Sequence, residues 1–161
     1  MKNLYIIRHA KSSWDVPLPD IERPITKRGE MDSHLMGDEL AKDLTFQMAV
    51  FVSNSQRTKD TYSIIKTYLH HLIKNEEFTD ELYVFDRSNL LKFIVNLPNS
   101  HNSVLIFGHN FAITDFVNSY GSKIIDNVST CGFVHLTFDI DHWQDIKKGK
   151  TQKVLFPKNL K

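Results

Sequence analysis

The sequence has little cysteine, no long apolar run and no excess of charge of one sign. Its only cysteine, Cys131, cannot form an intramolecular disulfide, which fits a reducing compartment. No run approaches the roughly 20 apolar residues of a membrane span, and the apolar residues 4–7 are too few for a signal sequence. The 20 basic and 19 acidic residues leave no excess of positive charge that would indicate binding to nucleic acid or to an anionic membrane. We therefore expect a soluble, cytoplasmic protein that binds neither.

Motifs for nucleotides and metals are also missing. Neither Gly-x-x-x-x-Gly-Lys nor Gly-x-Gly-x-x-Gly occurs, so a nucleotide cradle has no support. The 8 histidines show neither His-Glu-x-x-His nor a Cys–His ligand spacing. His70-His71 is predicted to be an exposed pair at a helix end, and Cys131 a small packed thiol rather than a nucleophile. We expect no cofactor and no metal.

What the sequence does contain is an alternation of short apolar runs and longer amphipathic segments. Its 161 residues are enough for one substantial core, and we expect a single domain over residues 1–161. Buried strands are predicted at residues 4–7, 48–52, 104–107 and 133–138. Helices are predicted at about residues 27–44, 56–72, 88–97 and 111–121. This order is typical of a three-layer α/β/α sandwich with a mostly parallel central sheet.

The first two helices have a predicted inward face. Thr26 is expected to cap the N-terminus of the first helix. The inward side chains of this helix are predicted to be Met31, Leu35, Leu40 and Leu44. Those of the second helix are predicted to be Tyr62, Ile65 and Leu69.

Two further segments lack helical or strand periodicity. Residues 10–24 form a long loop that carries Pro17, Pro19 and Pro24. Loops of this length in compact domains are often functional. The Lys-rich tail from Lys147 is expected to be a solvated C-terminal edge.

Basic side chains and histidines follow three of the predicted strands. Arg8-His9 follows the first strand, Arg57 opens the helix after the second, and Gly108-His109 follows the third. Because the carboxyl ends of parallel strands gather on one edge, we expect these residues to be neighbours. A helix N-terminus disfavours cations, so Arg57 at this place indicates a bound anion such as phosphate. The pattern predicts phosphate chemistry with a histidine as nucleophile.

The same residues resemble the signature of a known family. An early Arg-His, an Arg that opens the next helix and a late His after a buried strand are similar to the histidine phosphatase (phosphoglycerate-mutase-like) superfamily. Within it the chain most resembles the SixA-type protein-phosphohistidine phosphatases, which implies a minimal version of that fold without a cap insertion. The blocks that carry the resemblance are residues 4–14 (LYIIRHAKSSW), 22–29 (ERPITKRG), 81–83 (ELY), 108–110 (GHN) and 129–132 (STCG).

This resemblance implies a role for each site residue. His9 corresponds to the nucleophile that becomes phosphorylated, and Arg8, Arg57 and His109 to the groups that bind the phosphoryl oxygens. Arg23, in the Arg-Pro block of the long loop, resembles a further oxyanion contact of the SixA-type branch. Two positions depart from the wider superfamily, which has Gly in place of Ala10 and usually an acidic or amide residue in place of Lys11. Lys11 would add positive charge at the pocket rim.

The leaving group bears on the substrate class. An alkoxide leaving group benefits from a general acid, whereas phosphohistidine releases an imidazole whose conjugate acid has a pKa of about 6.5. Asn110 follows His109, and residues 70–87 are too few for a cap that would carry an acid. The remaining candidates are expected to be solvated loop or capping carboxylates: Asp15, Asp20, Asp80 and Glu81. This combination favours a phosphohistidine carried by a protein, such as a phosphotransfer domain.

Alternatives remain open at this point. The chain could instead hydrolyse a small phosphorylated metabolite with one of these carboxylates as acid, act as a mutase, or bind phosphate without turnover. Trp14 either contacts a partner at the pocket rim or pins the loop to the core. A backbone carbonyl of residues 10–24 is expected to hold the second ring proton of His9. A phosphate dianion is expected to raise the pKa of His109 and favour its protonated form.

Overall fold

A computed structural model describes residues 1–161 and has a central six-stranded sheet with the strand order β3-β2-β4-β1-β5-β6. The strands are β1 (Lys2–Arg8), β2 (Met48–Ser53), β3 (Ile73–Thr79), β4 (Ser103–Gly108), β5 (Phe133–Phe138) and β6 (Lys150–Leu155). Strands β3, β2, β4 and β1 run parallel, while β5 and β6 are antiparallel to their neighbours. The predicted, mostly parallel sheet is therefore confirmed.

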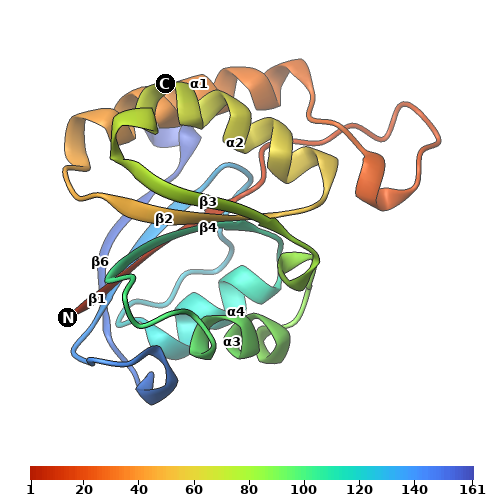
Figure 1. Cartoon of the computed structure of the whole chain (residues 1–161). Helices are drawn as coiled ribbons and strands as arrows, with labels where there is room; N and C mark the ends of the chain where they lie inside the picture. Colours follow the sequence, from red (N-terminus) through yellow and green to blue (C-terminus); the bar gives the residue numbers. More distant parts are fainter.

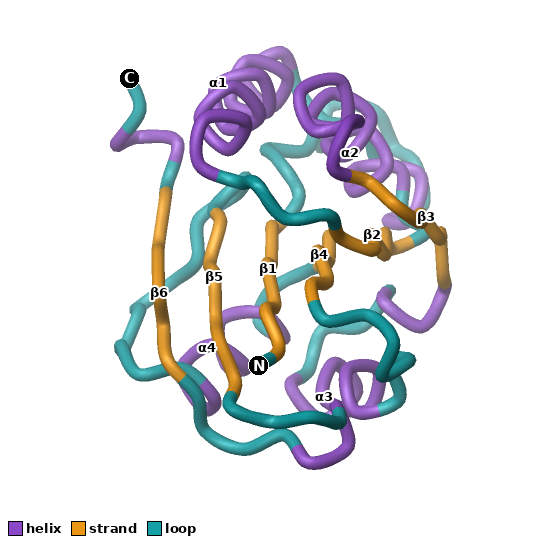
Figure 2. Tube along the Cα trace, turned by 60° about the vertical axis from the view of Figure 1, so that its left-hand side comes forward, coloured by secondary structure: helices purple, strands orange, loops and turns teal.

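Helices cover both faces of this sheet (Figure 1). Helices α1 (Lys27–Asp43) and α2 (Gln56–Leu69) pack on one face. Helices α3 (Arg87–Val95) and α4 (Ala112–Tyr120) pack on the other. The three layers are also visible in the tube of Figure 2, where the strands separate the two helix pairs. This confirms the predicted α/β/α sandwich. None of these helices has the length and apolar character needed to cross a bilayer.

Alternating side chains of the central strands supply two hydrophobic cores. In β1, Leu4 and Ile6 belong to the core beneath α3 and α4, whereas Tyr5 and Ile7 belong to the core beneath α1 and α2. Successive residues of a strand point to opposite faces, so a sheet covered on both sides needs apolar residues at every position. This is why β1, β2 and β4 contain continuous apolar runs, whereas His135 and Thr137 interrupt the apolar residues of β5.

The two edge strands were not predicted. Strand β3 is largely exposed and polar, and β6 lies in the Lys-rich tail that was expected to be only a solvated edge. That expectation is wrong for Lys150–Leu155, which pair with β5 through main-chain hydrogen bonds. An edge strand can be held by its backbone with few buried side chains, and so it shows no apolar run.

The inward face of α1 is offset from the prediction. Met31 is 62% exposed, so its predicted burial is wrong, while Leu35 and Leu44 are only partly buried and Leu40 is fully buried. The face that packs on the core also contains Met36, at 0% exposure. The buried face of α1 is rotated from the predicted one because α1 makes its closest contacts through two glycines rather than through apolar side chains.

Each of these two glycines faces another segment of the chain. A Cβ on Gly37 would lie 2.4 Å from Cδ2 of Tyr68 in α2, so the residue permits a close helix–helix approach. A Cβ on Gly29 would lie 2.5 Å from the main-chain oxygen of Lys11. The predicted cap Thr26 is confirmed, since its side chain accepts a hydrogen bond from the Gly29 N–H.

The other helices are close to the expected ones. Tyr62, Ile65 and Leu69 of α2 are buried as predicted. This helix ends at Leu69, and His70–Leu72 continue as a single 3₁₀ turn in which both histidines are exposed. The long loop contains a 3₁₀ turn at Asp20–Glu22 and returns through an isolated bridge between Ser12 and Ile25.

The close contact at Gly29 generates a stability prediction. We expect Gly29→Ala to lower the free energy of unfolding by about 1–3 kcal/mol, because the new methyl group overlaps the Lys11 backbone. The gain in helix propensity, about 1 kcal/mol, is too small to offset this. Urea unfolding measures the difference, and Glu30→Ala, at an exposed position one residue along, is the control with a change within about 0.5 kcal/mol. A Gly29→Ala protein more stable than wild type would contradict the prediction.

Candidate active site

The predicted residues converge at the carboxyl ends of the parallel strands. Arg8 and Gly108 are register partners across β1 and β4, so His9 and His109 leave neighbouring strands side by side. Their ring centroids are 5.5 Å apart, and Arg57 Nη2 lies 3.4 Å from His109 Nδ1. These residues open onto a pocket of about 290 Å³. We call it the cationic pocket; it is lined by Arg8, His9, Lys11, Ser12, Trp14, Asp20, Arg23, Arg57, Phe85, His109, Asn110 and Thr130.

His9 is held as a neutral imidazole with a defined tautomer. Its Nδ1 lies 2.8 Å from the Ala10 carbonyl oxygen, which accepts the proton of this nitrogen and leaves Nε2 unprotonated. The expected carbonyl of residues 10–24 is therefore present. Burial, together with the positive charges of Arg57, Arg8 and Arg23, lowers the pKa of His9 to about 3 despite the Ala10 contact. A nucleophilic nitrogen is thus available at neutral pH.

Main-chain contacts fix the position of His9. Its N–H donates to the Gly108 carbonyl at 3.2 Å, and the Cys131 N–H lies 3.0 Å from both the Arg8 and His9 carbonyls. The Ala10 N–H donates to Thr61 Oγ1 of α2 at 2.9 Å. Cys131 itself is fully buried, as predicted, and burial raises the pKa of its thiol to about 12. The cysteine therefore supports the histidine through its backbone and is not a nucleophile.

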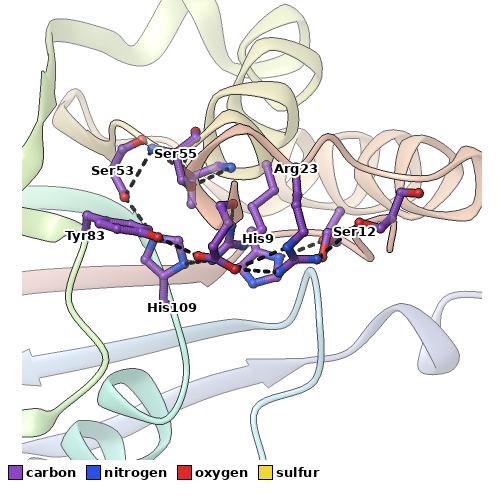
Figure 3. Close-up of polar contacts among 12 residues, drawn as sticks. His9, Ser12, Arg23, Ser53, Ser55, Tyr83 and His109 are labelled. Carbon is purple, nitrogen blue, oxygen red and sulfur yellow. Dashed lines mark hydrogen bonds and ion pairs between the residues drawn. The ribbon is translucent and has the colours of Figure 1, made fainter. Parts of the chain in front are cut away.

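Three guanidinium groups face the cationic pocket. Arg8 Nη1 donates to the Val128 carbonyl at 2.9 Å, and burial next to Arg57 lowers the pKa of Arg8. The Nε atoms of Arg8 and Arg57 are buried and have no hydrogen-bond partner. Arg23, only 5% exposed, donates to Ser12 Oγ at 2.8 Å. Figure 3 shows Arg23, Ser12 and His9 close together at this end of the site.

His109 is neutral in the free protein. Its Nε2 is 2.8 Å from Ser53 Oγ, and its Nδ1 accepts from Arg57, so the ring proton is on Nε2 (Figure 3). Burial first, then the neighbouring His9 and Arg57, lowers the pKa of His109 to about 2. The protonated form expected in the presence of a phosphate dianion stays a prediction.

Comparison with known proteins shows the family. A sequence profile of the histidine phosphatase superfamily (branch 1) matches residues 4–85, about half of the chain, and this range includes Arg8, His9, Arg23 and Arg57. The chain belongs to this superfamily. No curated protein matches the sequence.

Solved structures of SixA proteins show the same fold as this histidine phosphatase. The protein histidine phosphatase SixA complexed with tungstate is 24% identical, with a TM-score of 0.83 over 99% of both chains. SixA from Nakamurella multipartitia is 20% identical, with a TM-score of 0.80 over 97% of this chain and 96% of that one. SixA from Agrobacterium tumefaciens is 18% identical, with a TM-score of 0.80 over 97% of this chain and 98% of that one.

One of the four candidate carboxylates lies inside the site of this histidine phosphatase. Asp20 binds Arg57 Nη2 at 3.0 Å and Arg23 Nη2 at 3.1 Å, and the Tyr83 hydroxyl donates to it. Asp20 is exposed to solvent as expected, but it is also paired, which was not expected, because the loop folds back over two arginines 3 and 37 residues further along the chain. Asp15 and Glu81 are exposed, and Asp80 accepts from Asn54 outside the cationic pocket.

Trp14 lies at the rim of the cationic pocket. It is 75% exposed, and the Arg23 guanidinium carbon stacks 3.5 Å from the centre of its ring. The alternative in which Trp14 pins the loop to the core is therefore wrong. Lys11 also lines the rim, as expected, and is exposed.

Sequence reasoning missed several residues that support the site. Ser53 bonds the ring of His109, Thr61 accepts from the backbone beside His9, and Tyr83 packs 5.4 Å from His109, centroid to centroid. Tyr83 belongs to the block at residues 81–83, whose likeness to the SixA-type branch was a signal. Nothing in the local sequence indicates the contacts of Ser53 or Thr61, because both partners are distant in the chain.

The two neutral histidines generate a prediction about pH. In the unfolded chain each histidine gains a proton near pH 6.5, whereas in the fold the pKa is about 3 for His9 and about 2 for His109. Below about pH 6.5 the unfolded state therefore binds more protons than the folded state. The free energy of unfolding then decreases as the pH is lowered, by up to roughly 1.4 kcal/mol per pH unit for each histidine.

Urea unfolding between about pH 6 and pH 4.5 tests this prediction above the range in which carboxylates dominate. We expect His109→Gln, which retains a donor for Ser53, to show a shallower pH dependence than wild type. Equal slopes for the two proteins would show that His109 is not held neutral by the fold.

Proposed function

We propose that this histidine phosphatase, as one domain over residues 1–161, removes phosphate from a phosphohistidine carried by a protein, without a metal or cofactor, through a phospho-His9 intermediate. One observation carries the proposal: an unprotonated imidazole nitrogen of His9 lies beside the guanidinium groups of three arginines, of which Arg23 and Arg57 are buried. No group of three or more histidine, cysteine, aspartate or glutamate side chains is placed to hold a metal ion. The lone buried Cys131 is compatible with the cytoplasm, which we propose as the compartment.

The proposed reaction has two displacements at phosphorus. In the first, His9 Nε2 attacks, a bond from this nitrogen to phosphorus forms, and the bond from phosphorus to the substrate ring breaks. The electron pair stays on the substrate ring, which carries a proton on its other nitrogen and so leaves as neutral imidazole. Arg8, Arg57, Arg23 and His109 bind the equatorial oxygens, and the planar arginine forks suit this because they donate in pairs and stay charged. In the second, water attacks phosphorus, the bond to His9 breaks, and orthophosphate leaves.

The absence of a placed acid supports phosphohistidine as the substrate. Imidazole leaves with little proton assistance, since its conjugate acid has a pKa of about 6.5. Asp20 is the only candidate acid in the cationic pocket. Although partial burial by itself would raise its pKa, hydrogen bonds from Tyr83 and Arg57 and the charge of Arg57 lower it to about 2. An ionised Asp20 has no proton to give to an alkoxide, which disfavours the small-metabolite esterase.

The size and openness of the site also support a protein substrate. Residues 70–82 form two 3₁₀ turns and the edge strand β3, and α3 begins at Arg87, so this segment holds no inserted cap domain. The rim carries the exposed aromatic side chains of Trp14 and Phe85. Among proteins of the same fold, the SixA relative at 24% identity is a protein histidine phosphatase complexed with tungstate, a tetrahedral oxyanion like phosphate.

Phosphoryl transfer to His9 is the central test of this proposal. Rapid quenching during turnover of a phosphohistidine-bearing phosphotransfer domain should trap acid-labile, base-stable phosphate on the wild-type protein and none on His9→Ala. His71→Gln, at an exposed position outside the site, is the matched control and should be labelled like wild type. Labelling of His9→Ala would rule out the assigned nucleophile. Faster turnover of small phosphoesters than of the phosphoprotein, in the presence of chelator, would overturn the substrate class.

The role of Arg57 is tested by its removal. We expect Arg57→Ala to lower turnover by about 10³-fold or more, as for other arginines that stabilise a phosphoryl transition state. Arg87→Ala removes an exposed arginine at the start of α3 and is the control, with turnover close to wild type. Steady-state rates of phosphate release measure both. A loss below about tenfold for Arg57→Ala would show that this guanidinium does not contact the transferred group.

A further inference from the structure

Asp20 accepts hydrogen bonds from two of the arginines that the proposed function assigns to the phosphoryl group. Its Oδ1 accepts from Nε and Nη2 of Arg23 at 3.2 and 3.1 Å, and its Oδ2 accepts from Arg57 Nη2 at 3.0 Å. The Tyr83 hydroxyl donates to Oδ2 as well. A carboxylate in this position uses the N–H groups with which the two arginines would bind phosphate.

The burial of the three side chains shows why an anion is needed here. The side chains of Arg57 and Arg23 are only 3% and 6% exposed, whereas that of Asp20 is 43% exposed. Arginine cannot lose its proton in a protein, so a buried guanidinium needs a compensating anion. Asp20 provides this anion from the solvent side. Because nearly half of its side chain faces solvent, the carboxylate can leave without disturbing the core.

The backbone of Asp20 is anchored independently of its carboxylate. Its carbonyl accepts from Arg57 Nη1 at 2.7 Å and from the Arg23 N–H at 3.3 Å within the 3₁₀ turn. Rotation of the side chain alone would therefore free Arg57 Nη2 and Arg23 Nε and Nη2 from the carboxylate, while the main-chain contacts of Asp20 remain.

We propose that Asp20 is an internal competitor of the phosphoryl group: its carboxylate binds Arg23 and Arg57 in the free protein and rotates out when a phosphate binds. This inference rests on the proposed function only in requiring that the site binds phosphate. Asp20 then lowers the affinity of every phosphate ligand by the same factor. Free orthophosphate has no further contacts to offset this loss, whereas a phosphohistidine on a protein gains contacts with the rim. Asp20 thus promotes release of the orthophosphate product, while the rim contacts keep the phosphoprotein substrate bound.

Calorimetric titration with orthophosphate tests this inference without any need for turnover. We expect Asp20→Asn, which removes the charge and retains the size, to bind orthophosphate at least about tenfold more tightly than wild type. Asp15→Asn, in the same loop but exposed and without an arginine contact, is the control and should bind like wild type. Tyr83→Phe keeps Asp20 and removes one hydrogen bond to it, so its affinity should rise by a smaller factor.

The outcomes of this titration distinguish a failure of this inference from a failure of the proposed function. A purely structural role of Asp20 would leave the affinity of Asp20→Asn unchanged or weaken it, and either result would overturn the inference while the phosphate site stands. Binding to Asp20→Asn but not to wild type would support it in its strongest form. Failure of both proteins to bind orthophosphate would overturn the phosphate site, and with it both the proposed function and the inference.

Discussion

Permanently charged arginines buried next to imidazoles set the chemistry of this protein. A guanidinium keeps its proton when it is buried, so the free-energy cost of concentrating positive charge falls on the groups that can lose theirs. His9 and His109 are those groups, and their pKa values are lowered to about 3 and about 2. Burial is the largest cause of both shifts, and the positive charge that would hold a phosphoryl group lowers both pKa values further. The arginines proposed to bind the anion therefore also help to keep the proposed nucleophile unprotonated.

The fold holds these charged and neutral side chains together. Three parallel strands that are buried on both faces, β1, β4 and β2, deliver His9, His109 and the start of α2 to one edge through backbone hydrogen bonds rather than through local sequence. The imidazoles are held by the Ala10 carbonyl and by Ser53, so each has a defined tautomer before any ligand arrives. Such preorganisation means that little rearrangement is required when charge develops on the transferred group.

Sequence patterns predicted those parts of the molecule that are governed by local or periodic rules. Three of the four central strands contain continuous apolar runs, and Thr26 caps a helix. Arg8, His9, Arg57 and His109 lie at the ends of the strands, at the edge where these meet. The edge strands β3 and β6 were missed because backbone pairing, which leaves no apolar signature, holds them.

Other features depend on contacts between distant segments and could not be read locally. The phase of α1 is set by Gly29 and Gly37, which contact Lys11 and Tyr68, so apolar spacing alone placed Met31 on the wrong side. Asp20 looked like any loop carboxylate, because its partner Arg57 lies 37 residues away. Only the folded loop shows that this residue belongs to the site.

The ionisation of Asp20 links two properties that would otherwise be unrelated. The contacts with Arg57 and Tyr83 that lower its pKa to about 2 also place its carboxylate on the phosphate-binding groups. An aspartate in this state cannot protonate a leaving group, and in the proposed function it would compete with a phosphate for the N–H groups of Arg23 and Arg57. A substrate that needs no acid and that gains contacts beyond the phosphoryl group meets both conditions. Phosphohistidine on a protein surface has both properties, whereas a small alkyl phosphate has neither.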